Sequence, residues 1–598
     1  MEGYLEYHKT VSLEAPVDSS PPPESENETR LTSSIAAAQP APYQPEPYQP
    51  EPYQAGQQPD QQQRQDLFRL PDWRKRCIFG CSCLLQFLLQ FDMGAVALTL
   101  PKIAEDLNPP QVEVFAVATG YLLAQTVFQL VFSHVSQAAG RKFMYLSALL
   151  LYLAGAVAAA TGPTMHGLVG ARVMQGIGAA GMFTMSAIIF VDMTLPRRRA
   201  GWQALSQSCG AAGNIFGPLA AGLLFKRFSW HSIFVIEAAI GVFLLAAVSM
   251  LLPGDSRCWR ARLRELGYCD WGGMLVFFIC SVTFLVPINI GGNTAATEWT
   301  SPPVISCFVI AGISLGFLIY HQLKLASRPA FPKEIFKRWL TIIAYFGNAV
   351  CGMLLSMVFY NLVLFWEGVR GLSTLETGKR LLSATLAYPA AYALTGLAIR
   401  KWGKIKWATM VGALLSTLSL GLMQLTTADR PKATLIGISL LAGAACGMFA
   451  PAMLNTVIAT TESRWHAHAI ATRTLLYTAG QCAGISIGVA IFTNAFRGRL
   501  LDIHHADEAT QNAIEAFKTS GGLLSKIKEL KRLSPDGELV RVVVFALQMV
   551  WYFALVLALI TGIVASVPKC PSLPRDSETE IDTDVERQDG SPEMLTQH

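Results

Sequence analysis

Charge is scarce in this sequence. Asp, Glu, Lys and Arg make up 15% of its 598 residues, whereas soluble domains carry about 25%. Hydrophobic residues make up 52% and fall into many long apolar runs, each near the length that crosses about 30 Å of hydrocarbon. This distribution excludes an ordinary soluble protein and predicts an all-α polytopic membrane protein.

Several chemical signatures are also missing from the sequence. No P-loop is present, which excludes an ATP-driven pump, and no catalytic constellation indicates an enzyme. The histidines, such as His504 and His505, have no carboxylate or cysteine at a metal-binding spacing, so we expect no metal and no cofactor. Most of the cysteines lie in apolar runs, where they act as small hydrophobes. The basic residues lie between apolar runs and require no nucleic-acid partner.

Both ends of the chain are polar and are predicted to be disordered. Residues 1–72 form a Pro- and Gln-rich tail whose core, Pro42–Gln54, repeats PYQPE and favours polyproline II. A docking or sorting peptide is the alternative interpretation of this repeat. Residues 569–598 form an acidic tail.

Between the tails we count 14 apolar segments long enough to span a membrane. Their approximate bounds are 77–100, 114–134, 143–162, 166–190, 203–225, 231–252, 271–291, 303–322, 340–365, 380–398, 407–427, 433–459, 468–492 and 542–566. One side of the predicted bundle carries about 20 Lys and Arg in its connections, against about eight in the short connections on the other side. Because basic loops stay inside, both termini are expected in the cytosol.

An arginine lies inside the fourth apolar run, which contains ARVMQGIGAAG. Arg172 is about six residues from the outer end of the predicted helix, so it lies roughly 9 Å deep. A charge at that depth is expensive and indicates a functional site, although an arginine with a purely structural, internally paired role is the alternative. The next run contains GAAGNIFGPLAAG, in which Gly213 and Gly217 permit close helix packing and Pro218 kinks the helix.

These two runs resemble motifs of the major facilitator superfamily of secondary transporters. Arg172, Gln175, Gly176 and Gly178 are similar to its R-x-x-Q-G-x-G pattern, and the Gly-Pro run resembles the antiporter motif of its exporters. The overall pattern is most similar to the fungal drug:proton antiporter branch, which has 14 helices. The resemblance implies a six-helix half over 73–252, a linker with two extra helices over 253–322 and a second six-helix half over 323–568.

A third motif follows the second predicted helix, at Ser133–Lys142. Gly140, Arg141 and Lys142 match the family pattern G-x-x-x-D-x-x-G-R-K, but Gln137 replaces the acid. In the family this acid helps to latch the cytoplasmic side in the outward-open state. Glutamine keeps the hydrogen bond without the charge, so either a latch or simple anchoring of a tight loop is possible.

Two acids are candidates for proton coupling together with Arg172. Asp92 lies roughly 12 Å below the outer surface, similar in depth to Arg172, and helices 1 and 4 both line the cavity in this family. We therefore predict an Asp92–Arg172 pair that protonation would open, with a hydrogen-bonded structural aspartate as the alternative. Glu237 lies roughly 9 Å deep and is a second candidate. Because helix 6 is usually peripheral, we expect Glu237 to be a protonated structural residue.

The C-terminal half departs more from the family. Trp366 and Gln481 replace polar or charged cavity residues of relatives, and they are weak candidates for a cargo cavity together with Asn455. The scarcity of charge in this half predicts an apolar or weakly polar cargo.

The resemblance implies a transporter that exports a small hydrophobic or amphipathic compound, such as a drug, toxin or secondary metabolite. The proton gradient would supply the energy, and we expect a monomer in the plasma membrane, with the vacuolar membrane as an alternative. An importer, such as a siderophore transporter, and a non-transporting membrane sensor remain the alternative functions.

Overall fold

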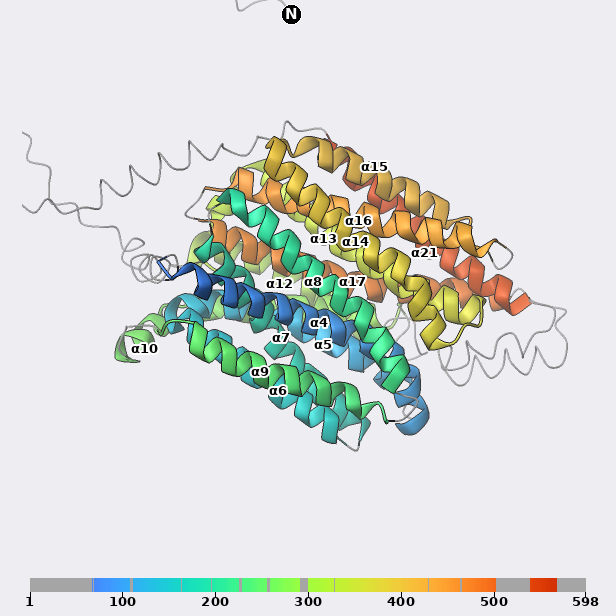
Figure 1. Cartoon of the computed structure of the whole chain (residues 1–598), viewed down its shortest axis with the longest axis horizontal. Coiled ribbons are helices and arrows are strands. Elements are labelled where there is room, and N and C mark those ends of the chain that lie inside the picture. The colour runs from blue at the N-terminus through green and yellow to red at the C-terminus, as the bar shows by residue number, and fades with distance from the viewer. Residues whose placement is uncertain are drawn as a thin grey trace, which may run out of the picture. The chain divides into compact units, whose positions relative to one another are not determined.

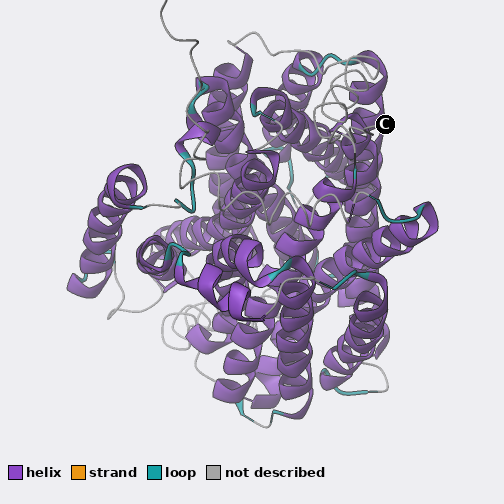
Figure 2. Ribbon diagram, turned by 90° about the vertical axis from the view of Figure 1, so that its left-hand side faces the viewer, coloured by secondary structure: helices purple, strands orange, loops and turns teal. Residues whose placement is uncertain are grey.

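Every element in the described part of this computed structural model is a helix (Figure 2). The structure describes residues 67, 69–107, 111–162, 164–194, 196–224, 228–254, 259–290, 299–326, 329–427, 430–462, 465–501 and 538–566. All of them belong to one compact unit, Gly56–His598. Residues 1–66 of the predicted N-terminal tail and the whole predicted acidic tail, 569–598, lie outside the described residues.

Fourteen long helices among the described residues correspond one to one with the 14 predicted apolar segments, which confirms the predicted fold class. They are α4 (Asp72–Leu107), α5 (Gln111–Ala139), α6 (Arg141–Thr161), α7 (Met165–Met193), α8 (Pro196–Leu224), α9 (His231–Leu251), α11 (Trp271–Ile290), α12 (Pro302–Tyr320), α13 (Trp339–Leu364), α14 (Thr374–Trp402), α15 (Lys406–Met423), α16 (Lys432–Thr460), α17 (His466–Leu501) and α21 (Glu538–Ser566). Thirteen of them are long and apolar enough to cross a membrane, and α8 is the one whose hydropathy is lower. Glycines and polar residues such as Gln207 and Asn214 lower the hydropathy of α8.

Within the described ranges, four short helices join these long ones. They are α10 (Trp259–Gly267), η2 (His321–Leu325), η3 (Lys333–Phe336) and η4 (Phe365–Val369). η2 and η4 are π-helical turns that continue α12 and α13, respectively.

Local sequence signals set several helix boundaries. Thr164 caps α7 by accepting from the backbone N–H of Gly167 at 3.2 Å, and Ser373 caps α14 by accepting from that of Glu376 at 3.4 Å. Such caps satisfy backbone donors that the first turn of a helix leaves unpaired. α14 ends at Gly403, whose φ of 68° is a left-handed conformation that glycine adopts without strain.

The helices pack as two groups that meet along two seams. α4 packs on α8 and α5 on α7 in the first group, while α14 packs on α16 and α13 on α17 in the second. In Figure 1 the first group runs from blue to green and the second from yellow to red. Contacts of α8 with α14 and of α5 with α17 join the groups. α11 packs on α5 and α17, and α12 packs on α11.

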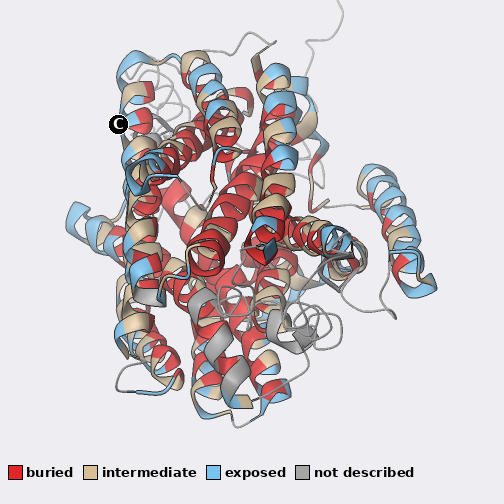
Figure 3. Ribbon diagram, turned by 90° about the vertical axis from the view of Figure 1, so that its right-hand side faces the viewer, coloured by how far each residue is buried: buried red, intermediate tan, exposed pale blue. Residues whose placement is uncertain are grey.

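The outer faces of the bundle are apolar. Figure 3 shows buried residues concentrated where helices face one another, with exposed residues on the outside. Many of the exposed side chains are large and hydrophobic, including Ile313 of α12 at 69% and Met250 of α9 at 79%. Soluble proteins rarely expose apolar surface on this scale, whereas lipid covers it at no cost.

Candidate functional site

Two acids and one arginine meet inside the first group of helices. α4 supplies Asp92, α7 supplies Arg172 and α9 supplies Glu237, and none is more than 1% exposed. Arg172 donates from Nη1 to Asp92 Oδ1 at 2.7 Å and from Nη2 to Asp92 Oδ2 at 3.1 Å. Bidentate pairs of this kind are among the strongest that a guanidinium makes with a carboxylate. The predicted Asp92–Arg172 pair is therefore present.

Gln175 joins Glu237 to this ion pair. Its Oε1 accepts from Arg172 Nη1 at 2.7 Å, and its Nε2 donates to Glu237 Oε2 at 2.7 Å. Because a guanidinium can only donate, Gln175 must turn its oxygen to Arg172 and its NH2 group to Glu237. The hydroxyl of Tyr152 lies 3.5 Å from the same Glu237 oxygen. We call Asp92, Arg172, Gln175 and Glu237 the charged cluster.

Glu237 reaches the charged cluster although α9 lies at the edge of the first group. α9 exposes Val235 and Phe243 on its outer side, but Glu237 is fully buried, as are Gly241 and Leu244 one and two turns further along. A helix at the edge of a bundle still has one inner face, and its 3.6-residue period places these three residues there. α9 packs on α6 and α4, and this contact brings Glu237 to the charged cluster.

The charged cluster contains one more acid than base. Arg172 uses both Nη atoms on Asp92 and Gln175, and its Nε donates to the carbonyl of Val117 at 3.3 Å. Glu237 Oε1 has no hydrogen-bond partner among the residues that the structure describes. An ionised buried carboxylate with an unpaired oxygen is costly, so a proton on Glu237 lowers the energy. Chemically, the charged cluster can therefore hold and release a proton.

Glycines bring α4 and α7, which carry the ion pair of the charged cluster, close to neighbouring helices. A Cβ atom at Gly176 of α7 would lie 2.4 Å from the backbone oxygen of Tyr121 on α5. At Gly213 and Gly217 of α8 it would lie 2.1 and 2.4 Å from backbone oxygens of α4. Real Cβ atoms essentially never approach so closely. The close packing predicted for this part of α8 is confirmed, and Pro218 lies at the same contact, against Gly94 of α4.

The motif between α5 and α6 anchors a tight turn. Gly140 has a φ of 96°, which side chains rarely adopt. Arg141 is buried, with its Nε 3.4 Å from Asp192 Oδ2 at the end of α7. Lys142 donates from Nζ to the carbonyl of Leu252, next to the end of α9, at 2.8 Å. The two basic residues thus join the turn to two neighbouring helices.

Gln137 of this motif reaches the second group of helices. Its Nε2 lies 3.0 Å from His468 Nε2 near the start of α17. Further along the same seam, Gln129 Nε2 donates to Thr478 Oγ1 at 3.0 Å. Both contacts join α5 to α17, so Gln137 takes part in the contact between the two groups.

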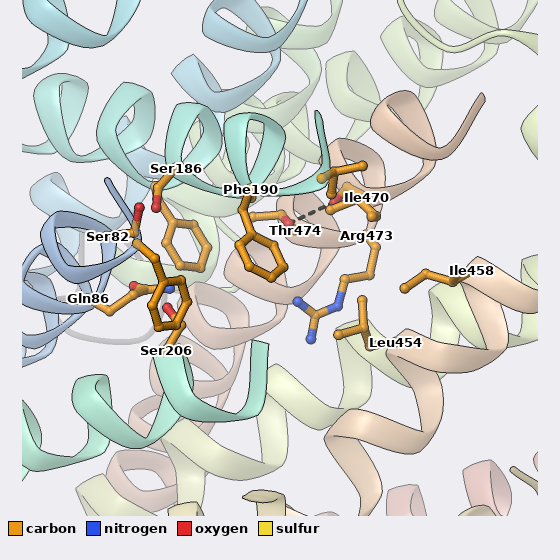
Figure 4. A pocket seen from close by; sticks show the side chains of 14 residues that line it. Ser82, Gln86, Ser186, Phe190, Ser206, Leu454, Ile458, Ile470, Arg473 and Thr474 are labelled. Carbon is orange, nitrogen blue, oxygen red and sulfur yellow. Dashed lines mark hydrogen bonds between the residues drawn. The ribbon is translucent and has the colours of Figure 1, made fainter. Parts of the chain in front are cut away.

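A pocket lies at the junction of the two groups. It is formed by α4, α7 and α8 from the first group and by α16 and α17 from the second, and it is partly open. The lining residues are Phe79, Ser82, Gln86, Phe183, Ser186, Ala187, Phe190, Val191, Ser206, Leu454, Ile458, Ile470, Arg473 and Thr474. Figure 4 shows the serines and Gln86 on one side of Phe190 and Arg473 on the other. We call this space the junction pocket.

Sequence reasoning missed Arg473, the one charged side chain among these lining residues. It is 2% exposed, and its Nε donates to Asn348 Oδ1 of α13 at 2.7 Å. Its guanidinium carbon lies 5.2 Å from the ring centre of Tyr477. Arg473 falls inside the predicted span 468–492, so the rule that singled out Arg172 applies to it equally. The expectation of an apolar or weakly polar cargo was made without taking the charge of Arg473 into account.

The three residues predicted to line a cargo cavity do not line the junction pocket. Trp366 is 1% exposed and packs in the hydrophobic core of the second group. Asn455 turns its side chain back to its own helix, where Nδ2 donates to the carbonyl of Pro451 at 2.8 Å. Gln481 is 8% exposed, at the close contact of α17 with Gly352 of α13. The sequence places these residues on the correct helices but does not reveal which way their side chains turn.

Comparison with known proteins identifies the class to which this fold and site belong. The family model of the Major Facilitator Superfamily matches residues 82–489, and the chain belongs to this family of membrane transporters. A solved structure of a bacterial homologue of the human lysosomal transporter Spinster, in an inward-facing and occupied conformation, is similar at a TM-score of 0.52. It is 15% identical and covers 83% of this chain and 98% of its own, so it supports the fold alone.

Three curated relatives are fungal transporters, and this chain covers most of the length of each. An MFS transporter of Phoma sp. is 28% identical, over 82% of this chain and 81% of its own. An efflux pump of Gibberella moniliformis is 25% identical, over 84% of this chain and 89% of its own. The MFS efflux transporter aclA of Aspergillus oryzae is 24% identical, over 84% and 91%. The chain thus resembles the fungal efflux branch of the family and is an integral multi-pass membrane protein.

Proposed function

We propose that this protein is a proton-coupled secondary transporter that exports a small hydrophobic or amphipathic compound by alternating access. The observation that carries the proposal is the charged cluster, in which Asp92 pairs directly with Arg172 and Glu237 is linked to Arg172 through Gln175. The efflux pumps among its relatives support the outward direction. Secondary metabolites and toxins are the substrate class that we infer, and the proton gradient supplies the energy without a bound cofactor.

Proton binding changes the charge balance of the cluster. When Asp92 is ionised, it holds Arg172 through both carboxylate oxygens. Protonation of Asp92 removes that attraction and leaves Arg172 without a counter-charge, so Arg172 must move toward another acceptor. Glu237 is the nearest candidate because Gln175 already links it to Arg172. The cluster is therefore an element with two arrangements, and the proton selects between them.

Two helices carry both the charged cluster and the junction pocket. On α4, Gln86 lines the pocket six residues before Asp92, a rise of about 9 Å. On α7, Ser186 lines the pocket fourteen residues after Arg172, about 21 Å along the helix. A shift of α4 or α7 that follows protonation would therefore alter the pocket directly.

The wider organisation follows from this mechanism. The halves 73–252 and 323–568 would rock about the junction pocket, and the two extra helices of 253–322 would stay beside them. We place both termini in the cytosol, the protein in the plasma membrane and the working unit as a monomer. With that orientation, the pocket lies nearer the cytosolic side and the charged cluster nearer the outside.

The first test measures accumulation of labelled hydrophobic toxins in cells that express the native chain or Asp92→Asn, with and without a proton uncoupler. Proton-driven export predicts lower accumulation with the native chain, and this difference should disappear in Asp92→Asn and under uncoupling. Asp72→Asn is the matched control because it removes an exposed acid from the first turn of the same helix. It should transport like the native chain.

The other outcomes distinguish the alternatives. Export that survives in Asp92→Asn but stops under uncoupling would move the proton site, with Glu237 next to be tested. Higher accumulation in expressing cells would indicate import. No change for any compound would contradict transport of this cargo class and leave the sensor function.

A further inference from the structure

Arg473 brings a buried positive charge to the junction pocket without an acidic partner. None of the 14 lining residues is acidic, and the other polar ones are Ser82, Gln86, Ser186, Ser206 and Thr474. Arg473 makes one hydrogen bond, from Nε to Asn348, within the part of the chain that the structure describes. Its two Nη groups are thus left to face the pocket, as Figure 4 shows.

This situation differs from that of Arg172. Arg172 is neutralised by Asp92, whereas Arg473 is 98% buried with only an amide oxygen and an aromatic ring against it. A buried cation without a counter-charge is costly, and such costs are retained where a ligand relieves them. Asn348 also fixes the plane of the guanidinium. Its two Nη groups are therefore already oriented to donate to both oxygens of a carboxylate.

We propose that the junction pocket binds an organic carboxylate, with both carboxylate oxygens on the Nη groups of Arg473. The aromatic rings of Phe79 and Phe190, whose centroids lie 5.9 Å apart, supply an apolar surface for the body of the molecule. The serines and Gln86 across the pocket supply hydroxyl and amide groups for further polar atoms. The ligand class is therefore an amphipathic aromatic or alicyclic acid. That this ligand is also the exported cargo rests on the function proposed above.

Matched pairs of small acids and their amides test the proposal directly. Benzoate, 2-naphthoate and 1-pyrenebutyrate are compared with benzamide, 2-naphthamide and 1-pyrenebutyramide, using calorimetric titration of the purified full-length protein. Each pair has the same shape and differs in charge. We expect at least one acid to bind at least tenfold more tightly than its amide, the difference expected for a charge-assisted hydrogen bond.

Two substitutions of Arg473 test whether this residue causes the preference for the acid. Arg473→Gln keeps a donor for Asn348 but removes the charge, so it should abolish the preference for the acid over its amide. Arg473→Lys keeps the charge without the two-pronged geometry and should retain part of the preference. Arg338→Gln, which removes an exposed arginine, is the matched control and should bind like the native protein. Thermal unfolding of each variant verifies that it is folded.

The outcomes separate this proposal from the proposed function. Equal binding of acids and amides, no binding of any acid, or an acid preference that persists in Arg473→Gln would overturn it. Export of a neutral compound alongside such a result would leave the transport function standing. Acid binding that depends on Arg473 without any transport would support this site and count against export.

Discussion

At the scale of single residues, the Asp92–Arg172 pair is stable only while both partners are present. Each group is at most 1% exposed, so removing one leaves the other as an uncompensated buried charge. We expect Arg172→Leu to lower the free energy of unfolding by about 3–5 kcal/mol. Arg172→Leu combined with Asp92→Leu should recover much of that loss, because an apolar pair has no charge to bury. Unfolding of the purified variants in detergent measures both values.

The full double-mutant cycle tests this prediction by measuring the coupling free energy between the two residues. Asp92→Leu alone completes the cycle and should also be strongly destabilised. A coupling free energy near zero between positions 92 and 172 would show that the two residues act independently, contrary to the bidentate contact.

Glu237 should behave differently from Asp92 when its charge is removed. If Glu237 is already protonated, Glu237→Gln replaces a neutral group by another of the same shape, and Gln175 Nε2 can still donate to its oxygen. We expect the free energy of unfolding to stay within about 1 kcal/mol of native, the value of one ordinary hydrogen bond. Asp92→Asn should cost more because Arg172 loses its counter-charge. Equal losses in the two variants would mean that native Glu237 is ionised.

At the scale of helices, glycines determine which pairs of helices can pack closely. α7 offers a matched comparison, because a Cβ atom at Gly176 would lie 2.4 Å from the Tyr121 backbone, whereas one at Gly170 would meet nothing within 4 Å. Gly176→Ala should therefore lower the free energy of unfolding by about 1–3 kcal/mol, since α5 and α7 must separate. Gly170→Ala should raise it by up to about 1 kcal/mol, through the higher helix propensity of alanine. Thermal unfolding of both variants tests the pair, and equal shifts would contradict it.

The sequence predicted helices and small-residue contacts well because these are local properties. Apolar runs located all 14 long helices, and the Gly-Pro run indicated where α8 packs closely. Residue depth along a helix, together with the resemblance to a family in which helices 1 and 4 line the cavity, was enough to pair Asp92 with Arg172. The sequence could not predict contacts that depend on how each helix is rotated about its axis. Nothing in the pattern indicated that Glu237 faces Gln175, or that the Asn455 side chain turns back to its own helix. Arg473 is different, since its position inside an apolar run was visible in the sequence.

At the scale of the whole molecule, contacts join the two groups of helices at both ends of the bundle. Gln137 meets His468 at the end that the basic loops place in the cytosol. At the opposite end, Leu219 of α8 lies against Gly378 of α14, since a Cβ atom at Gly378 would be 3.7 Å from the Leu219 side chain. Alternating access requires these two contacts to open in turn, so a stronger cytosolic contact should favour opening on the outside.

Gln137→Asp provides that stronger contact, because a carboxylate can form an ion pair with a protonated His468, whereas an amide cannot. We expect a cysteine at Leu219, in a background without other reactive cysteines, to react several-fold faster with an impermeant maleimide in Gln137→Asp than in the native chain. Gln137→Asn is the matched control, since it has the same length as Asp without the charge, and it should show no increase. Similar labelling of the Asp and Asn variants would mean that position 137 only anchors the turn before α6. A faster reaction that His468→Ala abolishes would identify the α5–α17 contact as the latch between the two halves.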